Sequence, residues 1–171
     1  MKGYVQVYTG DGKGKTTAAL GLALRAAGAG LNVYFAQFVK GMKSSEIESV
    51  KKLSDRITIR QYGNVSFING TPGKEDISAA RKGLTEAREY MLSGRYQVII
   101  LDEANIATHY NLFSAEDLLE LVRLKPDDVE LVITGRYADQ RIIEAADLVT
   151  EMKDIKHYYR NGISARDGIE K

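Results

Sequence analysis

The chain has 171 residues, of which 44% are hydrophobic and 27% charged, and these values are typical of one folded domain with a sizeable core. The formal net charge of +1 argues against binding that is driven by bulk attraction to nucleic acid or to an anionic membrane. The absence of cysteine excludes disulfides, thiolate metal sites and cysteine nucleophiles.

The N-terminal region and the apolar segments indicate a cellular location. The first strand is expected by Tyr4, which leaves no room for a secretory signal peptide before it. No apolar run approaches the roughly 18 residues that span a bilayer. We therefore expect a cytoplasmic protein that is formed by one domain over residues 1–171 and that binds neither membrane nor nucleic acid.

Strand-like and helix-like segments alternate along the chain. The expected strands are Tyr4–Tyr8, Asn32–Phe38, Ile57–Tyr62, Gln97–Asp102, Val129–Thr134 and, more weakly, Leu148–Met152. The expected helices are Thr16–Ala27, Ser44–Leu53, Glu75–Ser93, Ala115–Leu124 and Asp139–Ala145, the fourth with Ser114 as N-cap and Asp117 completing a near capping box. The alternation predicts a single α/β domain with a mostly parallel sheet and helices on both faces. A ligand is then expected at the carboxyl ends of the strands.

A glycine-rich turn joins the first strand to the first helix. Residues 9–17 read TGDGKGKTT, which is a phosphate-binding P-loop in its expected setting. Glycines let the backbone N–H groups turn inward, and these groups together with the positive end of the helix hold phosphate oxygens. The predicted nucleotide-binding residues are Gly10, Asp11, Gly12, Lys13, Gly14, Lys15, Thr16 and Thr17. Thr9 stands where the usual pattern has glycine, and the alternative is a Gly/Lys-rich surface turn without a ligand.

A second element of the phosphate site is predicted further along the chain. The apolar run Val98–Leu101 ends in Asp102 and Glu103. In P-loop proteins such a strand lies beside the P-loop strand, and one carboxylate binds Mg²⁺ directly or through water. Adjacent residues leave a strand on opposite sides, so both acids reach the site only if the chain turns there. The P-loop and this run together predict a RecA-like P-loop domain, although an apolar strand that ends in an acid is also a common feature without function.

Further along the chain, an arginine, a loop and a histidine are candidates for a part in the site. Arg136 follows a buried strand and is placed to hold phosphate in a fork, the alternative being a surface pair with Asp139 or Glu144. The loop Gly63–Lys74 is either a substrate loop or a simple connector. His109 is interpreted as structural or substrate-lining.

Five sequence blocks, in this order, resemble the P-loop type of ATP:corrinoid adenosyltransferase. They are TGDGKGKTTAALGLALRAAGAG, AQFVKG, IILDEANIATHYNL, VITGR and ADLVTEMKDIKHYYRNGISARDGIE, and the match as a whole runs from about Gly3 to Glu170. The resemblance implies that ATP donates its 5′-deoxyadenosyl group to the reduced cobalt of a corrinoid and that triphosphate leaves. It also implies a homodimer and a reduced flavodoxin or flavin as the reductant.

The resemblance assigns roles to residues at matching positions. Residues 10–17 would bind the triphosphate, Lys15 would neutralise it, and Thr16 with Glu103 would hold Mg²⁺, or Mn²⁺ as an alternative ion, with Asp102 in support. Lys15, Thr16 and Glu103 are thus the expected catalytic residues, and Arg136 a further nucleotide contact. The family often has Phe and Trp in a loop over the corrinoid; this chain has no Trp, and the resemblance implies that Phe67 with Ile68 would take that place.

Two further hypotheses follow from the P-loop alone. The first is an ordinary P-loop ATPase or phosphotransferase, in which Glu103 would act as the base for an attacking water. The second is a non-catalytic protein that binds a nucleotide or a corrinoid. The two differ from the adenosyltransferase in their products: phosphate or ADP in the first case, and none in the second.

Overall fold

Six parallel strands form one sheet in the order β3-β2-β4-β5-β1-β6. The computed structural model describes residues 1–39, 45–53, 55–63 and 71–170. The strands are β1 (Val5–Thr9), β2 (Val33–Phe38), β3 (Ile57–Tyr62), β4 (Val98–Asp102), β5 (Glu130–Thr134) and β6 (Leu148–Glu151). All residues of the inner strands β2 and β4 are buried, as their apolar sequences predict.

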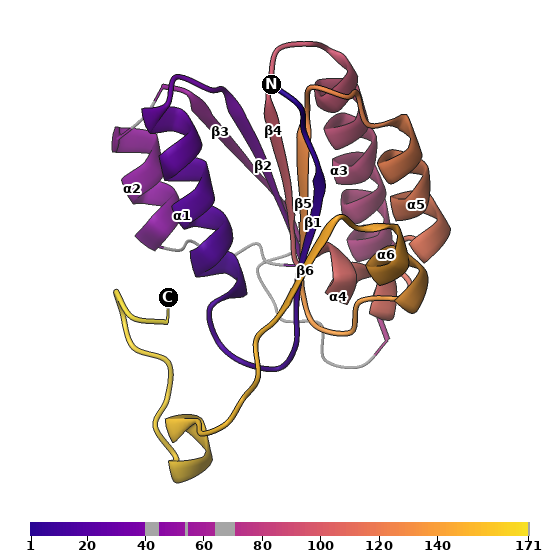
Figure 1. Ribbon diagram of the computed structural model, residues 1–171. Coiled ribbons are helices and arrows are strands. Elements are labelled where there is room, and N and C mark those ends of the chain that lie inside the picture. Colours follow the sequence, from indigo (N-terminus) through magenta and orange to yellow (C-terminus); the bar gives the residue numbers. More distant parts are fainter. Residues whose placement is uncertain (40–44, 54, 64–70, 171) are drawn as a thin grey trace.

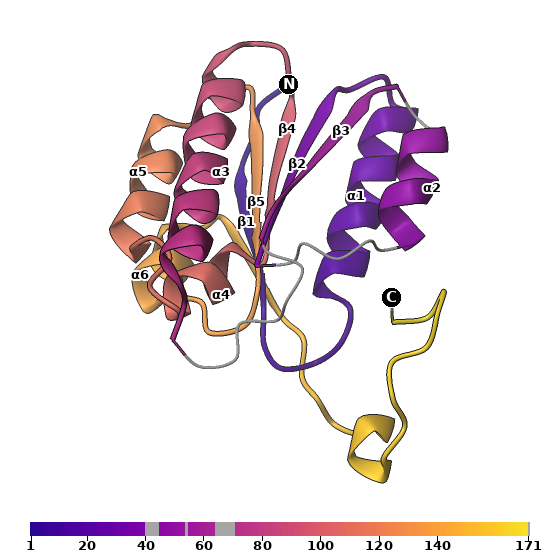
Figure 2. The same cartoon turned by 180° about the vertical axis from the view of Figure 1, so that it is seen from behind.

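Helices cover both faces of the sheet (Figures 1 and 2). One face is covered by α1 (Lys15–Gly28) and α2 (Ser45–Leu53). The other face is covered by α3 (Lys74–Leu92), α4 (Ala104–His109), α5 (Ala115–Leu124) and α6 (Gln140–Ala145). None of the helices in the described parts of the chain is long and apolar enough to cross a membrane.

Alternation along the strands divides the core into two clusters, one beneath each helical layer. Phe35 and Ile100 belong to the cluster that includes the α1 alanines, whereas Tyr34 and Leu101 belong to the cluster beneath α3 and α5. Side chains of adjacent strand residues leave opposite faces of a sheet. The same rule determines which strand-end residues can reach α1, and it therefore sets the composition of the site described below.

The predicted α/β class with a parallel sheet is confirmed, and the predicted element bounds lie within about one or two residues of those observed. The N-cap of α5 is confirmed too. Ser114 Oγ accepts a hydrogen bond from the backbone N–H of Asp117 at 3.2 Å, and a carboxylate oxygen of Asp117 accepts from the N–H of Ser114 at 2.7 Å. This pair closes a capping box at the start of the helix.

One prediction about the sheet is wrong. The strand that ends in Asp102 does not lie beside the P-loop strand, because β5 is hydrogen-bonded between β4 and β1. Sequence patterns specify which segments form strands but not the order in which they pair. The P-loop and the end of β4 still lie close together, because α1 begins at the P-loop and packs on β4.

Two short elements were not predicted. Helix α4 begins directly after Glu103, without a polar N-cap side-chain hydrogen bond, and is six residues long. The 3₁₀ turn η1 (Tyr158–Asn161) lies in the C-terminal segment, which projects from the sheet and returns toward the start of α1 (Figure 1). Both lack the sustained apolar periodicity by which longer helices are recognised.

Candidate active site

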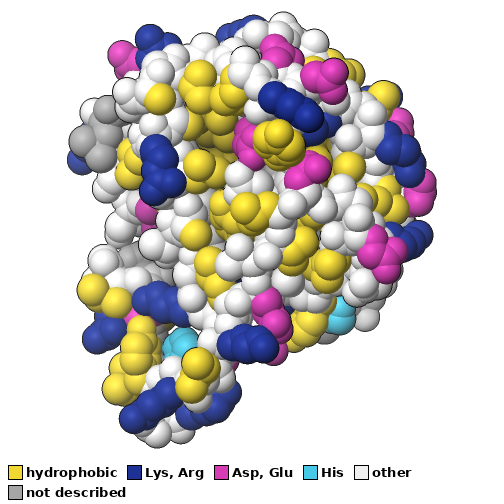
Figure 3. Space-filling model, viewed as in Figure 1, with side chains coloured by type: hydrophobic (Ala, Val, Ile, Leu, Met, Phe, Trp, Pro, Cys, Tyr) yellow, Lys and Arg dark blue, Asp and Glu magenta, His cyan; other side chains and the backbone are white. Residues whose placement is uncertain are grey.

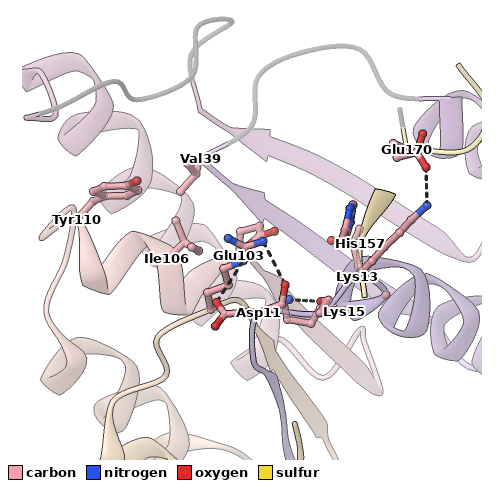
Figure 4. A pocket seen from close by; sticks show the side chains of 13 residues that line it. Asp11, Lys13, Lys15, Val39, Glu103, Ile106, Tyr110, His157 and Glu170 are labelled. Atoms are coloured by element: carbon pink, nitrogen blue, oxygen red, sulfur yellow. Dashed lines mark hydrogen bonds and ion pairs between the residues drawn. The ribbon is translucent and has the colours of Figure 1, made fainter. Parts of the chain in front are cut away.

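A cavity of 460 Å³ lies at the carboxyl ends of the strands, where the fold predicts a ligand. Its wall is formed by Asp11, Gly12, Lys13, Gly14, Lys15, Thr16, Val39, Glu103, Ile106, Tyr110, Arg136, His157 and Glu170. Charged side chains, including Lys13 and Lys15, lie on one side of the cavity, and apolar ones lie on the other (Figure 4). Two predicted P-loop residues, Gly10 and Thr17, are not part of the described wall.

The glycines of the P-loop permit a close approach by the chain that follows β6. Gly10 has φ of 92°, and a Cβ atom there would lie 2.5 Å from the carbonyl oxygen of Met152. The N–H of Gly12 donates to that same carbonyl at 2.6 Å, so this loop N–H is bound by protein backbone in the structure. Thr9 replaces the usual glycine without strain because it is the last residue of β1 and pairs with Glu151 of β6.

Lys15 is held at the centre of the P-loop by the carbonyls of the loop itself. Its Nζ donates to Gly10 O at 2.6 Å and to Gly12 O at 2.7 Å, and the residue is only 7% exposed. Burial lowers the pKa of Lys15, whereas the nearby Glu103 carboxylate acts in the opposite direction. The residue thus places a weakly hydrated ammonium in the cavity, where an anionic ligand would favour its charged form.

Asp102 is fully buried and accepts hydrogen bonds from three side chains. The hydroxyl of Thr16 donates to its two carboxylate oxygens at 3.0 and 3.1 Å, and the hydroxyl of Thr134 donates at 2.7 Å. The amide of Gln37 donates at 3.0 Å. Because the Thr16 proton is directed to Asp102, the lone pairs of its oxygen are left for an electrophile in the cavity.

Glu103 reaches the cavity because the chain turns at this residue. Its φ and ψ are 59° and 22°, a left-handed conformation that is uncommon for a residue other than glycine. Its backbone N–H donates to the hydroxyl of Thr134 at 3.0 Å, which supports the turn. Asp102 is therefore buried beneath α1, while the adjacent carboxylate lies in the cavity wall.

Arg136 lies in the cavity wall and contacts the P-loop. Its Nη2 donates to the carbonyl oxygen of Asp11 at 3.2 Å, and its Nε lies 3.8 Å from the carboxylate of that residue. The alternative partners are occupied by other side chains, because Asp139 pairs with Arg141 and Glu144 accepts from Gln140. The predicted position of Arg136 at the site is thus supported by the geometry.

Three apolar residues of the cavity were not predicted from the sequence. Val39, Ile106 and Tyr110 lie together on the side of the cavity away from Lys13 and Glu170 (Figure 4). Val39 has φ of 65°, a strained conformation for a β-branched side chain, and such strain is concentrated at functional sites. They come from two segments that the fold brings together, and a local pattern could not have identified them as a group.

The C-terminal segment supplies the last part of the wall. Lys13 Nζ lies 3.1 Å from a carboxylate oxygen of Glu170 and donates to Ile169 O at 3.0 Å (Figure 4). Glu170 also accepts from Tyr158 and from the Arg166 guanidinium. His157 lines the cavity, and its Nδ1 accepts from the backbone N–H of Tyr159 at 3.1 Å. Nothing in the sequence pattern alone placed His157 or Glu170 at the site.

The loop residue Phe67 and the histidine His109 were also singled out from the sequence. Phe67, expected over a corrinoid, and most of the loop Gly63–Lys74 fall within residues 64–70, which lie outside the described residues. His109 packs its ring 4.2 Å from that of Tyr137, and it is not among the described residues that line the cavity.

Known proteins provide an independent comparison. The sequence profile of the family described as ATP:corrinoid adenosyltransferase BtuR/CobO/CobP matches residues 1–170. The chain belongs to this family. It is 38% identical to a corrinoid adenosyltransferase of a Sinorhizobium species, over 99% of this chain and 80% of that protein. It is 32% identical to the corrinoid adenosyltransferases of Pseudomonas aeruginosa and Escherichia coli K12, over 99% of this chain and 84% and 86% of those proteins.

The adenosyltransferase family blocks converge on the cavity. Each of the five blocks that carry the resemblance contributes at least one wall residue. The first contributes the P-loop, and the others contribute Val39, then Glu103 with Ile106 and Tyr110, then Arg136, and finally His157 with Glu170. The five blocks that carry the resemblance, which are far apart in the chain, therefore meet around one cavity.

Proposed function

We propose that this chain transfers the 5′-deoxyadenosyl group of ATP to the reduced cobalt of a corrinoid at the cavity above the P-loop. The observation that carries the proposal is that one cavity joins a phosphate cradle to an apolar wall. The cradle, with Lys15 at its centre, suits a triphosphate. The wall of Val39, Ile106 and Tyr110 suits the rings of a nucleoside or a corrinoid.

The proposed reaction makes modest demands on the protein. Reduced cobalt supplies the electron pair that attacks C5′, the cobalt–carbon bond forms, and the C5′–O bond breaks with its electron pair leaving on triphosphate. Since cobalt is the nucleophile, no serine or histidine needs to be activated. The protein must align the two reactants, exclude water and stabilise the charge that develops on the triphosphate.

The residues for that task lie in the charged part of the cavity. The Lys15 ammonium and the positive end of α1 would neutralise the triphosphate, and the Arg136 guanidinium would contact it from β5. Lys15 now donates to two loop carbonyls, so a bound phosphate would share or replace these bonds. Lys13 would add charge if it exchanged the Glu170 carboxylate for phosphate.

A magnesium ion fits the donor set. The Thr16 oxygen and the Glu103 carboxylate lie in the same cavity wall, and hard oxygen donors beside a phosphate cradle are what Mg²⁺ prefers. We propose that these two residues hold the ion directly and that Asp102 acts through Thr16; Mn²⁺ would use the same donors. When bound, the ion would stabilise the negative charge of the leaving triphosphate.

The assembly, the location and the reductant belong to the same proposal. We propose a homodimer, supported by apolar side chains on the projecting C-terminal segment: Ile155 is 90% and Tyr159 is 73% exposed (Figure 3). We propose that the enzyme works in the cytoplasm, where ATP is available. A reduced flavodoxin or flavin would supply the electrons for cobalt. Light scattering of the purified chain tests the dimer, for which a monomer mass at micromolar concentration is the contrary result.

An anaerobic assay tests the activity. The purified chain is mixed with Mg·ATP and chemically reduced cobalamin, the visible spectrum is followed, and the phosphate products are separated. A light-sensitive adenosyl product with one equivalent of triphosphate is expected. Release of ADP and phosphate with unchanged corrinoid would instead indicate an ordinary P-loop ATPase, and saturable binding of both ligands without turnover a binding protein.

A further inference from the structure

A row of polar side chains crosses the carboxyl-terminal end of the sheet. Its members come from four neighbouring strands, β3, β2, β4 and β5, and are Gln61, Gln37, Asp102 and Thr134. Gln37 is in register with Gln61 on one side and with Asp102 on the other. The row lies on the face that α1 covers, because residues two positions earlier, such as Phe35 and Ile100, pack in the α1 cluster.

The hydrogen bonds of the row run toward the carboxylate. Gln61 Nε2 donates to Gln37 Oε1 at 2.9 Å, and Gln37 Nε2 donates to an oxygen of Asp102 at 3.0 Å. An ionised carboxylate only accepts, so it requires the NH₂ end of the Gln37 amide. The bond from Gln61 occupies the other end and fixes this orientation. Gln37 is 1% exposed and Asp102 is 0% exposed, so neither is satisfied by bulk water.

The row contacts the Thr16 hydroxyl of the proposed metal site through Asp102. The Thr16 hydroxyl is shared between the two oxygens of Asp102, the Thr134 hydroxyl donates to one of them, and the Gln37 amide donates to the other. Without the Gln37 amide, the buried carboxylate would lose one of its three side-chain donors and would turn toward the two threonine hydroxyls. The Thr16 hydroxyl would then lose its fixed orientation toward the cavity.

We infer that Gln37, held in place by Gln61, is a positioning residue for the nucleotide-bound divalent cation. It acts through Asp102 on the Thr16 hydroxyl and touches neither ATP nor the ion. The inference rests on the proposed metal site at Thr16 and Glu103 and adds to it the residues that align it. Removal of such supporting partners of metal ligands costs about 10- to 100-fold in metal affinity.

The test measures ATP binding by calorimetry with Mg²⁺ and with EDTA. Gln37→Met keeps the length of the side chain but removes the donor, and Gln61→Met removes the support one step away. The control is Tyr34→Phe, which removes a buried hydroxyl from the same strand on the opposite face, where it bonds to Tyr62. Circular dichroism establishes whether each variant is folded. If Gln37→Met does not fold, Gln61→Met provides the test in its place.

Mg²⁺ should tighten ATP binding by a factor that is about 10-fold smaller in Gln37→Met than in the wild type. The affinity for ATP in EDTA should stay at the wild-type value. Gln61→Met should act in the same direction but less, and Tyr34→Phe should leave the factor unchanged. An unchanged factor in both glutamine variants, or an equal loss with and without Mg²⁺, overturns the inference. A wild-type chain that shows Mg²⁺-dependent ATP binding but no adenosylation contradicts the proposed function only, since the variants are scored by binding.

Discussion

At the scale of single residues, two adjacent carboxylates have different environments because of one backbone angle. Asp102 ends β4 in an extended conformation and is buried, whereas Glu103 has φ of 59° and lies in the cavity wall. A left-handed residue other than glycine costs about 1–3 kcal/mol. The hydrogen bond from its N–H to Thr134 offsets part of this cost. The turn thereby separates a supporting acid from one that can bind a ligand.

Glu103→Gln should separate metal use from nucleotide binding. The amide keeps the shape of the side chain but loses the charge that would bind the cation, so turnover should fall by about 100-fold or more. ATP affinity in EDTA should be unchanged, and added Mg²⁺ should tighten it less than in the wild type. Glu144→Gln, a surface change on α6, is the control. Wild-type turnover in Glu103→Gln would refute the metal role.

Lys15→Ala should reduce turnover by about 100- to 1000-fold, because the charge that stabilises the departing triphosphate is removed. The steady-state rate of adenosylcorrinoid formation checks this expectation. Lys153→Ala is the matched control, since that side chain is 71% exposed and carries the same charge near the P-loop. Near-normal activity of Lys15→Ala would discredit the site assignment.

At the scale of elements, the C-terminal segment is attached to the P-loop mainly by polar contacts. Gly12 bonds to Met152, and Lys13 bonds to Glu170 and to Ile169 O. The side chains of the segment are largely exposed, so there is little apolar burial to hold it. Its position therefore depends on a small number of charges and on one buried loop contact.

Glu170→Gln should loosen this segment without unfolding the domain. The carboxylate accepts from Lys13, Arg166 and Tyr158, and the neutral amide weakens all three bonds. Limited proteolysis should cut the segment faster than in the wild type, while the thermal midpoint of the domain changes little. Glu151→Gln, an exposed acid of β6, is the control. Equal cleavage rates in both variants would show that Glu170 does not hold the segment.

The pH dependence of this attachment follows from the same carboxylate. The Arg166 guanidinium, followed by the Tyr158 hydroxyl, holds the pKa of Glu170 well below its usual range. A lowered pKa in the folded state stabilises the attachment above the unfolded pKa, about 4.3, and this contribution is lost as pH falls toward the folded value. Protection of the segment from proteolysis should therefore be constant from neutral pH down to about 5.

At the scale of the whole molecule, two helical glycines have opposite surroundings: Gly83 of α3 is buried against the sheet, and Gly21 of α1 is exposed. Helix α3 lies so near β2 and β3 that a Cβ atom at Gly83 would lie 2.4 Å from Tyr62 and 2.9 Å from Phe38. On the exposed side of α1, by contrast, a Cβ at Gly21 would meet no heavy atom within 4 Å. The same substitution should therefore have opposite effects at the two positions.

Gly83→Ala should lower the free energy of unfolding by about 1–3 kcal/mol, because the added methyl displaces packed aromatic rings. Gly21→Ala should raise the free energy of unfolding by about 0.5–1 kcal/mol, because alanine loses less backbone entropy than glycine when the helix forms. Urea denaturation followed by circular dichroism measures both. Equal shifts in the two variants would contradict the observed difference in packing.

Local signals in the sequence were sufficient for the six strands, for five of the helices and for the P-loop side of the site. Apolar runs determined the six strands, the turn at residues 9–17 determined the phosphate cradle, and Asp102–Glu103 marked the end of β4. Each of these depends on neighbouring residues, whose backbone preferences and periodicity act over a few positions. The resemblance of five ordered blocks then predicted the family, and the profile match confirmed it.

Only the tertiary structure decided how these parts meet. The placement of β5 between β4 and β1, the apolar wall of Val39, Ile106 and Tyr110, and the return of Glu170 to Lys13 all join residues far apart in the chain. So does the row from Gln61 to Thr134, which exists because four strands pair in one register. Strand order and register arise from the packing of the whole core, and no local pattern specifies them.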